Sequence, residues 1–327
     1  MVPGGESSGR ERAWPSQVAY QDAIQNPSTA FADPDLRSAR PLDLTPFGLP
    51  QPVTGQYATV YRMEAADGRL WAVRLFRRDV QGRTEVYRAF RAHRDALTSA
   101  GAFIQGDVAD GDVADGDVAG LVPFEYQERG IFAQGQWYPL VRMPWVTGVP
   151  LNAFVEASLN DPKAIDAVGK RFRYLASALA QARVAHGDLQ HGNLLVEPES
   201  GALRLIDYDG VYVPALAGRP GRETGHPSYQ HPERTTAHYG PLMDRFSLLV
   251  IAAALTIVAR EPEHWYRLDN GDNLLFRSED FANPSLSRAF EVLRVSRDAQ
   301  VQRAVRALRE ASAAPIGRVP ALERAFP

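Results

Sequence analysis

The sequence has no cysteine and almost no lysine. The absence of cysteine excludes disulfides, cysteine-ligated zinc and thiol chemistry. Lys163 and Lys170 are the only lysines among 36 basic residues, so nearly every positive charge belongs to an arginine. A site that usually uses lysine is therefore expected to carry arginine here, whose planar guanidinium meets anions with a different geometry.

The chain also lacks a strong excess of one charge and a long hydrophobic run. Its formal charge of −3 gives no argument for a nucleic-acid surface. The longest apolar run, residues 246–258, is too short to cross a bilayer and indicates a buried helix. The first residues are glycine, serine and charged residues rather than a signal peptide, so we expect a cytoplasmic protein without membrane contact. At 327 residues the chain can hold one large two-lobed domain or two small ones.

Polar residues gather at one end of a predicted hairpin in the middle of the chain. Two apolar runs, residues 194–196 and 203–206, are separated by a short turn and indicate a buried β-hairpin. Asp188 and Asn193 precede the first strand, and Asp207 follows the second. Carboxylate and amide oxygens are ligands that Mg²⁺ prefers when substrate phosphates complete its shell. We therefore expect a magnesium site here, with a solvated polar turn as the simpler alternative.

The residues before this hairpin indicate strands and one helix. Residues 55–65 and 70–76 indicate two strands joined by the turn 66–68. Residues 84–97 place apolar side chains at helical spacing and indicate an amphipathic helix. Residues 106–120 repeat Gly-Asp-Val-Ala-Asp without the spacing of a calcium loop, so we expect an acidic surface loop.

Further strands and then helices follow. Residues 121–126 and 137–141 indicate two strands around a turn at 130–135. Residues 1–45 are rich in glycine, serine, proline and arginine and are expected to form a flexible arm. Helical patterns occupy residues 151–159, 162–184, 286–293 and 297–311.

Several of these motifs resemble those of the eukaryotic-like serine/threonine protein kinases. His186-Gly187-Asp188 with Asn193, followed by Asp207-Tyr208-Asp209, resembles His-Arg-Asp-x-x-x-x-Asn followed by Asp-Phe-Gly. The segment 225–233, Gly-His-Pro-Ser-Tyr-Gln-His-Pro-Glu, is similar to Gly-Thr-Pro-x-Tyr-x-Ala-Pro-Glu. Asp244 opens a segment that resembles Asp-x-Trp-Ser-x-Gly-Val.

The resemblance covers about residues 48–311 and implies an α+β, two-lobed protein-kinase-like fold. A small β-rich N-lobe with one long helix would occupy residues 46–143, a hinge 144–148, and a larger, mainly helical C-lobe 149–327. The implied function is an ATP- and Mg²⁺-dependent kinase that phosphorylates serine or threonine of a protein substrate. The oligomeric state is not predicted.

The resemblance also assigns roles to individual residues. Asp188 would orient the substrate hydroxyl and accept its proton, while Asn193 and Asp207 would hold Mg²⁺. Arg74 stands where the family has the lysine that grips the phosphates. The nucleotide would contact Gly55, Val60, Ala72, Arg74, Met143, Pro144 and Val146. Structural support would come from Glu85, His186, Glu233 and Asp244, with Asp244 accepting hydrogen bonds from the catalytic-loop backbone.

Departures from the family pattern leave two other functions open. Arg74, the single glycine Gly55 and the lack of a mid-helix glutamate favour a pseudokinase that binds nucleotide or acts as a scaffold; Glu85 is the candidate partner of Arg74. His-Gly-Asp-Leu-x-x-Gly-Asn is also similar to aminoglycoside-type phosphotransferases, although Glu233 and the segment at Asp244 belong to protein kinases. Gln190 replaces the lysine usual in serine/threonine kinases, so the acceptor is left open.

Overall fold

A computed structural model describes residues 14–55, 58–99, 120–268 and 271–326. The chain is a mixed α+β protein, as expected from the sequence, and every paired strand is antiparallel. It divides into two compact units: unit 1 comprises residues 1–82 and 124–145, and unit 2 comprises residues 83–123 and 146–327. The acidic repeat predicted at 106–120 lies outside the described residues, except for Gly120.

Unit 1 is built on one antiparallel sheet with strand order β1-β3-β4-β6-β5, and β2 also pairs with β3. The strands are β1 Arg40–Pro41, β2 Val53–Thr54, β3 Ala58–Glu64, β4 Leu70–Phe76, β5 Glu125–Ala133 and β6 Gln136–Pro144. β3 and β4 confirm the two strands predicted around the turn 66–68. The next pair differs from the prediction, because β5 begins at Glu125 and continues through Gly130. Its register shifts between Gln127 and Ile131, and a Cβ at Gly130 would collide with the Leu140 side chain.

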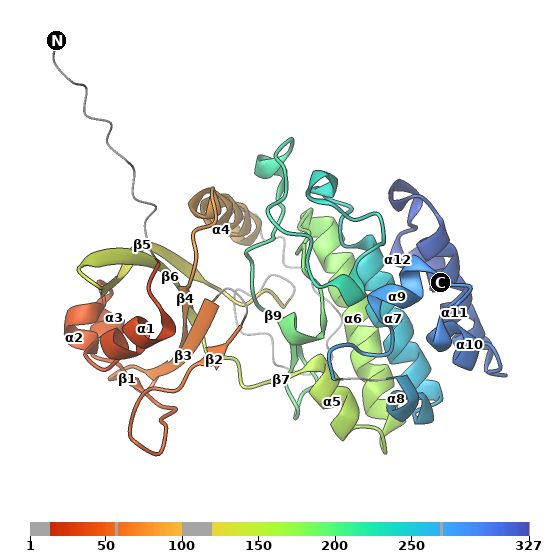
Figure 1. Ribbon diagram of the computed structural model, residues 1–327, viewed down its shortest axis with the longest axis horizontal. Coiled ribbons are helices and arrows are strands. Elements are labelled where there is room, and N and C mark those ends of the chain that lie inside the picture. The colour runs from red at the N-terminus through yellow and green to blue at the C-terminus, as the bar shows by residue number, and fades with distance from the viewer. Residues whose placement is uncertain (1–13, 56–57, 100–119, 269–270, 327) are drawn as a thin grey trace, which may run out of the picture. The chain divides into compact units, whose positions relative to one another are not determined.

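The segment expected to be a flexible arm is folded from residue 14 onward. It forms α1 Gln17–Ile24, α2 Pro27–Ala30 and α3 Pro34–Arg37, which cluster against the sheet of unit 1 (Figure 1). Tyr20, Ile24, Phe31 and Leu36 are fully buried and share a core with Tyr61, Met63, Val73 and Leu75. The sequence pattern concealed this core, because prolines divide its apolar residues among helices too short to show helical periodicity.

One arginine joins this segment to the sheet. Arg142 Nη1 lies 2.9 Å from Asp33 Oδ2 and 3.1 Å from Asp35 Oδ2, and its Nη2 lies 2.7 Å from Glu125 Oε2. The guanidinium also lies over Trp71, 4.4 Å from the ring centroid. Because the Arg142 side chain is only 16% exposed, these charges are screened less than surface pairs and hold α3 against β4, β5 and β6.

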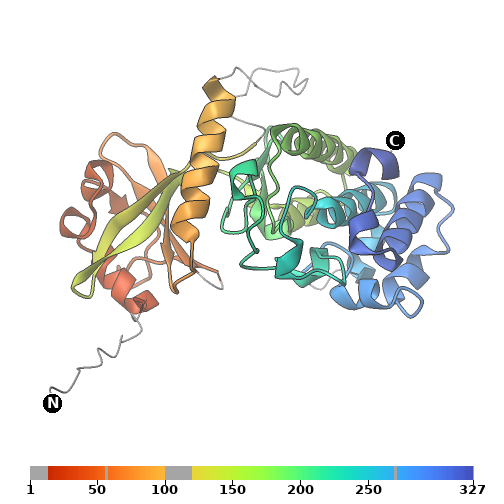
Figure 2. The ribbon, with the colours of Figure 1, turned by 90° about the horizontal axis from the view of Figure 1, so that it is seen from above.

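Unit 2 is mainly helical. Its α-helices are α4 Arg83–Ser99, α5 Leu151–Ala157, α6 Pro162–Ala182, α7 Arg245–Arg260, α8 Glu263–Leu268, α9 Ser278–Ala282, α10 Arg288–Leu293, α11 Ala299–Ala313 and α12 Leu322–Ala325. Short 3₁₀ helices occupy η1 His191–Asn193, η2 Pro214–Leu216, η3 Pro227–Tyr229, η4 Thr236–His238 and η5 Ile316–Arg318. Helix α7 packs against both α6 and α11 (Figures 1 and 2). It contains the apolar run 246–258 and is buried on nearly all sides, as the sequence predicted. Among the described residues, no helix is long and apolar enough to cross a membrane.

Helix α4 belongs to unit 2, whereas the sequence analysis assigned it to an N-lobe at 46–143. The helix itself was predicted correctly, but its partners were not. Its buried residues include Val86, Tyr87 and Phe90, and the ring of Phe90 packs 5.0 Å from that of Tyr208. Periodicity identifies the buried face of a helix but not the segment that covers it.

The central hairpin has the predicted form. β8 Leu194–Val196 pairs with β9 Leu203–Leu205, and β7 Val149–Pro150 adds a third strand beside β8. The turn is closed by Gly201, whose N–H donates to the carbonyl of Glu197 at 2.7 Å. This small sheet places the residues before β8 and after β9 at the same end.

Candidate active site

Asp188 and Asn193 are held together at the start of the hairpin. The Asn193 amide Nδ2 donates to the Asp188 carbonyl at 2.9 Å and to Asp188 Oδ2 at 3.0 Å. The backbone N–H of His226 donates to Asp188 Oδ1 at 2.7 Å. Both carboxylate oxygens of Asp188 are therefore oriented. Because its nitrogen is used twice, Asn193 presents its amide oxygen away from Asp188.

Asp207 follows β9, and a backbone hydrogen bond joins its segment to Asn193. The N–H of Ile206 donates to the carbonyl of Asn193 at 3.1 Å, which fixes the residue before Asp207. Asp207 has a φ of +69°, a left-handed conformation that residues other than glycine adopt at a cost of about 1–3 kcal/mol. Asn193 and Asp207, the two predicted magnesium ligands, thus lie on adjoining backbone segments.

His186 connects the Asp188 loop to the Asp207 segment. Its Nδ1 accepts a hydrogen bond from the Asp188 N–H at 3.3 Å. Its Nε2 lies 2.9 Å from the carbonyl of Ile206. An imidazole that accepts at Nδ1 and donates at Nε2 is the neutral tautomer with its proton on Nε2. The predicted supporting role of His186 therefore has a geometric basis.

Asp244 supports the same loop from the start of α7. Its carboxylate is buried and accepts hydrogen bonds from the N–H groups of His186 at 2.5 Å and Gly187 at 2.9 Å. These are the backbone hydrogen bonds that the kinase resemblance implied. Burial raises the pKa of the Asp244 carboxyl group, while the two N–H donors and Arg234 act in the opposite direction.

Glycine is required between His186 and Asp188. Gly187 has a φ of +84°, and a Cβ there would collide with the carbonyl of Gly210. Close by, Ala185 and Tyr212 exchange two backbone hydrogen bonds, at 3.1 and 2.7 Å. Residues 185–187 and the segment after Asp207 are therefore packed backbone to backbone. This close approach leaves no room for a side chain at position 187.

Tyr208 forms a buried link that the sequence analysis did not select. Its ring lies between His186 and Phe90, with centroid distances of 6.0 and 5.0 Å. Its hydroxyl donates to the carbonyl of Leu205 at 2.6 Å and lies 3.0 Å from that of Val122. The hydroxyl therefore satisfies its hydrogen bonding inside the core. The signal in the sequence was the replacement of phenylalanine by tyrosine in the Asp-Phe-Gly-like motif.

In unit 1, strand register brings four predicted nucleotide-contacting residues to one face of the sheet. Val60 on β3 lies opposite Arg74 on β4, and Ala72 lies opposite Met143 on β6. Alternate residues of a strand share a face, so all four lie on the side opposite the core that packs against α1–α3. The Arg74 guanidinium lies 5.7 Å from the centroid of the Phe76 ring.

The other predicted nucleotide contacts lie at strand ends. Gly55 donates from its N–H to the carbonyl of Ala58 at 3.0 Å and so closes the turn from β2 to β3. Pro144 is the last residue of β6. Val146 falls in unit 2, at the beginning of the segment that leads to β7.

Two predicted supporting residues have partners that the sequence did not indicate. Glu85 on α4 forms an ion pair with Arg219, although the sequence analysis had offered it as the partner of Arg74. The carboxylate of Glu233 accepts a hydrogen bond from the Ile316 N–H at 2.9 Å, which ties the segment 225–233 to the C-terminal part of unit 2.

The histidines of this region have local structural roles. His226 Nδ1 accepts from the Ser228 N–H at 3.2 Å, and His231 Nε2 lies 3.0 Å from the Ala314 carbonyl. His238 forms a reciprocal capping interaction with Thr235. Among the described residues, no three histidine, cysteine or carboxylate side chains form a group that could hold a metal. A site with fewer protein ligands is the arrangement that Mg²⁺ commonly uses with nucleotides.

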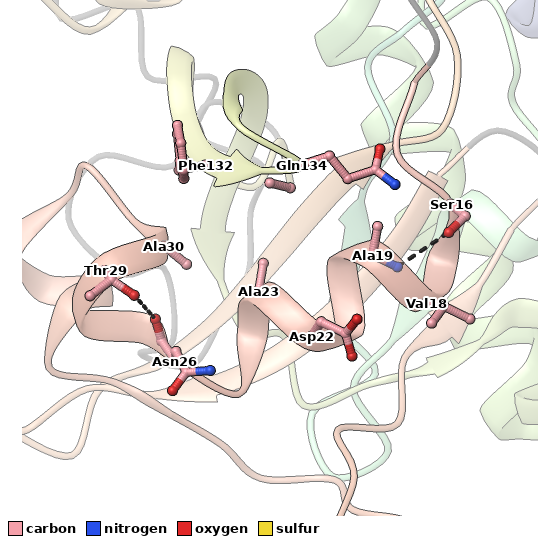
Figure 3. A pocket seen from close by; sticks show the side chains of 11 residues that line it. Ser16, Val18, Ala19, Asp22, Ala23, Asn26, Thr29, Ala30, Phe132 and Gln134 are labelled. Atoms are coloured by element: carbon pink, nitrogen blue, oxygen red, sulfur yellow. Dashed lines mark hydrogen bonds between the residues drawn. The ribbon is translucent and has the colours of Figure 1, made fainter.

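Two grooves lie away from these residues. One, of about 580 Å³ in unit 1, is lined by α1, α2 and the β5–β6 turn; Phe132 and Gln134 face the helices across it (Figure 3). The other, of about 680 Å³ in unit 2, is lined by α6 and α7 and includes Lys163 and Lys170. Neither contains a predicted site residue.

No protein-family model matches the chain, and no curated protein matches it.

Proposed function

We propose that the chain is an ATP- and Mg²⁺-dependent phosphotransferase with a two-lobed protein-kinase-like fold, unit 1 being the small lobe and unit 2 the large one. One observation carries this proposal: the Asn193 side chain is hydrogen-bonded to Asp188, and the Asn193 carbonyl is hydrogen-bonded to Ile206, the residue that precedes Asp207. Asn193 uses its amide nitrogen to hold Asp188 and its backbone carbonyl to hold the residue before Asp207. A purely structural turn does not need these three side chains in this arrangement.

The donor set at this end of the hairpin fits a magnesium ion. The Asn193 amide oxygen and the Asp207 carboxylate are hard oxygen ligands on adjoining backbone segments. When bound with ATP, Mg²⁺ neutralises phosphate charge as the γ-phosphoryl group is transferred. Asn193 and Asp207 are the residues that would hold it. The left-handed backbone of Asp207 is consistent with a functional site, because such strain persists where the surroundings enforce it.

Asp188 is assigned the role of general base. An ionised carboxylate is an acceptor only, and the hydrogen bonds from His226 and Asn193 fix both of its oxygens. As the hydroxyl oxygen of the acceptor bonds to the γ-phosphorus and the bond to ADP breaks, the hydroxyl proton moves to a carboxylate oxygen of Asp188. Its contribution to the rate is expected to be about 10²–10⁴-fold.

The proposed acceptor is a serine or threonine of a protein, in a cytoplasmic setting where ATP is available. The segment 225–233, which resembles the end of a kinase activation segment, runs directly past Asp188. A Cβ at Gly225 would lie only 2.9 Å from Asp188 Oδ1, and its neighbour His226 binds that oxygen. A segment in this position can align an extended substrate beside the general base.

In unit 1, the nucleotide contacts are assigned to the face of the sheet that carries Arg74. The guanidinium of Arg74 supplies the positive charge that lysine supplies in the family. Ala72 and Met143, on the same face, offer apolar contact for the base. Gly55, at a tight turn, offers backbone close to the phosphates.

A pseudokinase is the second candidate, and the Glu85–Arg219 ion pair favours it. Glu85, which the sequence offered as the partner of Arg74, pairs with Arg219 instead of acting as the glutamate that orients the phosphate-gripping lysine in active kinases. As a pseudokinase, the chain would bind a nucleotide or a partner without useful transfer.

Thermal unfolding of the purified chain with and without Mg·ATP tests the proposed function. Ligand at about a thousand times its Kd stabilises a folded protein by about 4 kcal/mol, so millimolar nucleotide should raise Tm clearly for a micromolar Kd. The shift should disappear with EDTA and in Asp207→Asn, but remain in Asp166→Asn, which alters an exposed carboxylate on α6. The absence of any shift in the parent protein would overturn the proposal.

A further inference from the structure

Asp209 is a nearly buried carboxylate that the proposed reaction does not use. It lies two residues after Asp207, and its side chain is 11% exposed. The Tyr87 hydroxyl donates to Asp209 Oδ1 at 2.7 Å, and Arg83 Nε lies 3.9 Å from the same oxygen. Tyr87 and the 4% exposed Arg83 side chain both come from α4. One carboxylate therefore joins the Asp207 segment to this helix.

The net stability of the fold does not explain why this carboxylate and guanidinium are buried together. Removing a carboxylate and a guanidinium from water costs several kcal/mol, and apolar residues of similar volume are often as stabilising as a buried ion pair. What such a pair does provide is a defined relative position for the two segments that carry it. Here one of these segments includes Asp207, whose left-handed backbone must be held by its surroundings.

Two further contacts connect α4 to residues after Asp207, and a third connects it to the end of α6. Phe90 packs on the Tyr208 ring at 5.0 Å, Glu85 pairs with Arg219, and His93 Nε2 lies 2.7 Å from the carbonyl of Ala182. Arg83, Tyr87 and Phe90 have the spacing i, i+4, i+7, so they share one face of the helix. This face is directed at the residues immediately following Asp207.

We infer that Asp209 is a positioning residue: with Tyr87 and Arg83 it clamps α4 to the Asp207 segment, so that magnesium affinity depends on a helix that supplies no magnesium ligand. The inference rests on the proposed function. It assigns α4 to the large lobe as a fixed support of the metal site. The clamp acts through Asp207, and neither Asp209 nor Tyr87 is assigned a contact with the nucleotide.

The test uses the full-length chain and the substitutions Tyr87→Phe, Asp209→Asn and both together. Tyr87→Phe removes only the hydroxyl, so it should leave the folded core intact. Tyr174→Phe and Asp166→Asn are matched controls, because both side chains are exposed on α6. The first readout is the Mg²⁺ concentration that gives half-maximal thermal stabilisation by ATP. The second is amide hydrogen exchange over residues 83–93 and 205–211 without nucleotide.

The clamp predicts that Tyr87→Phe and Asp209→Asn each raise the half-saturating Mg²⁺ concentration about 10-fold or more, as changes around metal ligands typically do. The double variant should show less than the product of the single effects, because the residues act through one contact. Exchange should accelerate in both segments together. The controls should match the parent.

Each contrary result has a distinct meaning. A lower Tm with unchanged Mg²⁺ dependence would make Asp209 merely structural and overturn the inference. If the parent itself showed no Mg·ATP binding, the proposed function would fail, and hydrogen exchange would decide the clamp alone. Acceleration in both segments would then support it, and acceleration confined to one segment would overturn it.

Discussion

The two units present their candidate functional residues in different ways. In unit 1 they project from neighbouring strands, and the alternation of the sheet places Val60, Ala72, Arg74 and Met143 on one face. In unit 2 they lie on loops whose shape depends on partners distant in sequence. His186 and Gly187, for example, donate backbone hydrogen bonds to Asp244, 58 and 57 residues further along.

This difference determines how a substitution should act. A change on the unit 1 face alters one side chain and leaves the ladder hydrogen bonds of the sheet in place. A change in the unit 2 loops removes a contact that also positions its neighbours. We therefore expect the largest functional losses in unit 2, and the largest stability losses where unit 1 depends on its N-terminal segment.

The substitution Asp188→Asn should have the largest effect. If Asp188 is the base, transfer to a protein acceptor should fall about 10²–10⁴-fold, while Mg·ATP binding should remain nearly intact. Both Asp188 oxygens accept hydrogen bonds, from Asn193 and from the His226 N–H. The amide nitrogen of the new asparagine will face one of these donors, so the folding stability of the variant should fall. Phosphate-transfer rates and nucleotide-induced Tm shifts should be measured on the same preparations.

Asp272→Asn is the matched control for that experiment. Asp272 is exposed, and its Oδ1 lies 3.2 Å from Nε2 of the His226 ring, whereas Asp188 is bound by the backbone N–H of His226. Its transfer rate should equal that of the parent. An Asp188→Asn protein that phosphorylates at the parent rate would remove Asp188 from its assigned role.

Phe31→Ala should cause the largest loss of stability in unit 1. Phe31 is fully buried in the core beneath the sheet, so the truncation should cost about 3–5 kcal/mol. Val18→Ala on the exposed side of α1 should change stability by less than about 0.5 kcal/mol. Denaturant unfolding followed by tryptophan fluorescence reports mainly on unit 1, which contains four of the five tryptophans: Trp14, Trp71, Trp137 and Trp145. Equal stability of the two variants would show that the segment contributes nothing to this core.

The N-terminal segment also shows the limits of the sequence analysis. The strands β3 and β4, the apolar periodicity of α6 and the continuous apolar run of α7 could be recognised, because each element carries its own local pattern. The core residues Tyr20 and Ile24 lie in the short helix α1, and Phe31 is an extended residue directly after the four-residue α2, so no long helical pattern develops. Composition alone indicated an arm, and long-range packing overrode it.

The candidate site was predictable only in part, for a similar reason. Asn193 and Asp207 could be placed together because they flank the two strands of one hairpin, and Asp188 lies five residues before Asn193. The supports Tyr87, Asp209 and Arg219 could not, because each acts across more than a hundred residues of chain. The sequence around each of these residues does not indicate which distant side chain it contacts.

Substitution of Arg74 tests the unit 1 face and separates a kinase from a pseudokinase. If the guanidinium binds phosphate, Arg74→Ala should lower transfer about 10- to 100-fold, because a hydrogen bond to a charged group contributes about 1.5–3 kcal/mol. Arg74→Lys should preserve or raise the rate. Arg129→Ala is the control, since Arg129 is an exposed arginine that also stacks on an aromatic ring, Trp137. Equal, near-zero rates for the parent and both Arg74 variants would favour the pseudokinase.

Two tyrosines, the buried Tyr61 and the partly buried Tyr239, provide the finest comparison between the units. Burial raises the pKa of Tyr61 in unit 1 to about 12 and that of Tyr239 in unit 2 to about 12. The Tyr239 hydroxyl donates to the Val211 carbonyl at 2.6 Å. The Tyr61 hydroxyl is buried without a hydrogen-bond partner among the described residues. The same shift in pKa therefore arises in two different environments.

At about pH 8, where both tyrosines are protonated, the two phenylalanine variants should differ. Tyr239→Phe should lose about 0.5–1.5 kcal/mol with its hydrogen bond, whereas Tyr61→Phe removes an unsatisfied hydroxyl and should be neutral or stabilising. Because each folded pKa lies above the unfolded value near 10, the parent should lose stability as pH rises from about 10 towards 12, by up to about 3 kcal/mol per tyrosine. Each phenylalanine variant should lack the part of that loss that its own tyrosine causes.

Denaturant unfolding at about pH 8 and at about pH 12 measures these differences. Tryptophan fluorescence follows unit 1, and far-UV circular dichroism follows mainly unit 2. A Tyr61→Phe protein less stable than the parent at about pH 8 would mean that the Tyr61 hydroxyl is satisfied in solution, and the contrast between the two sites would disappear.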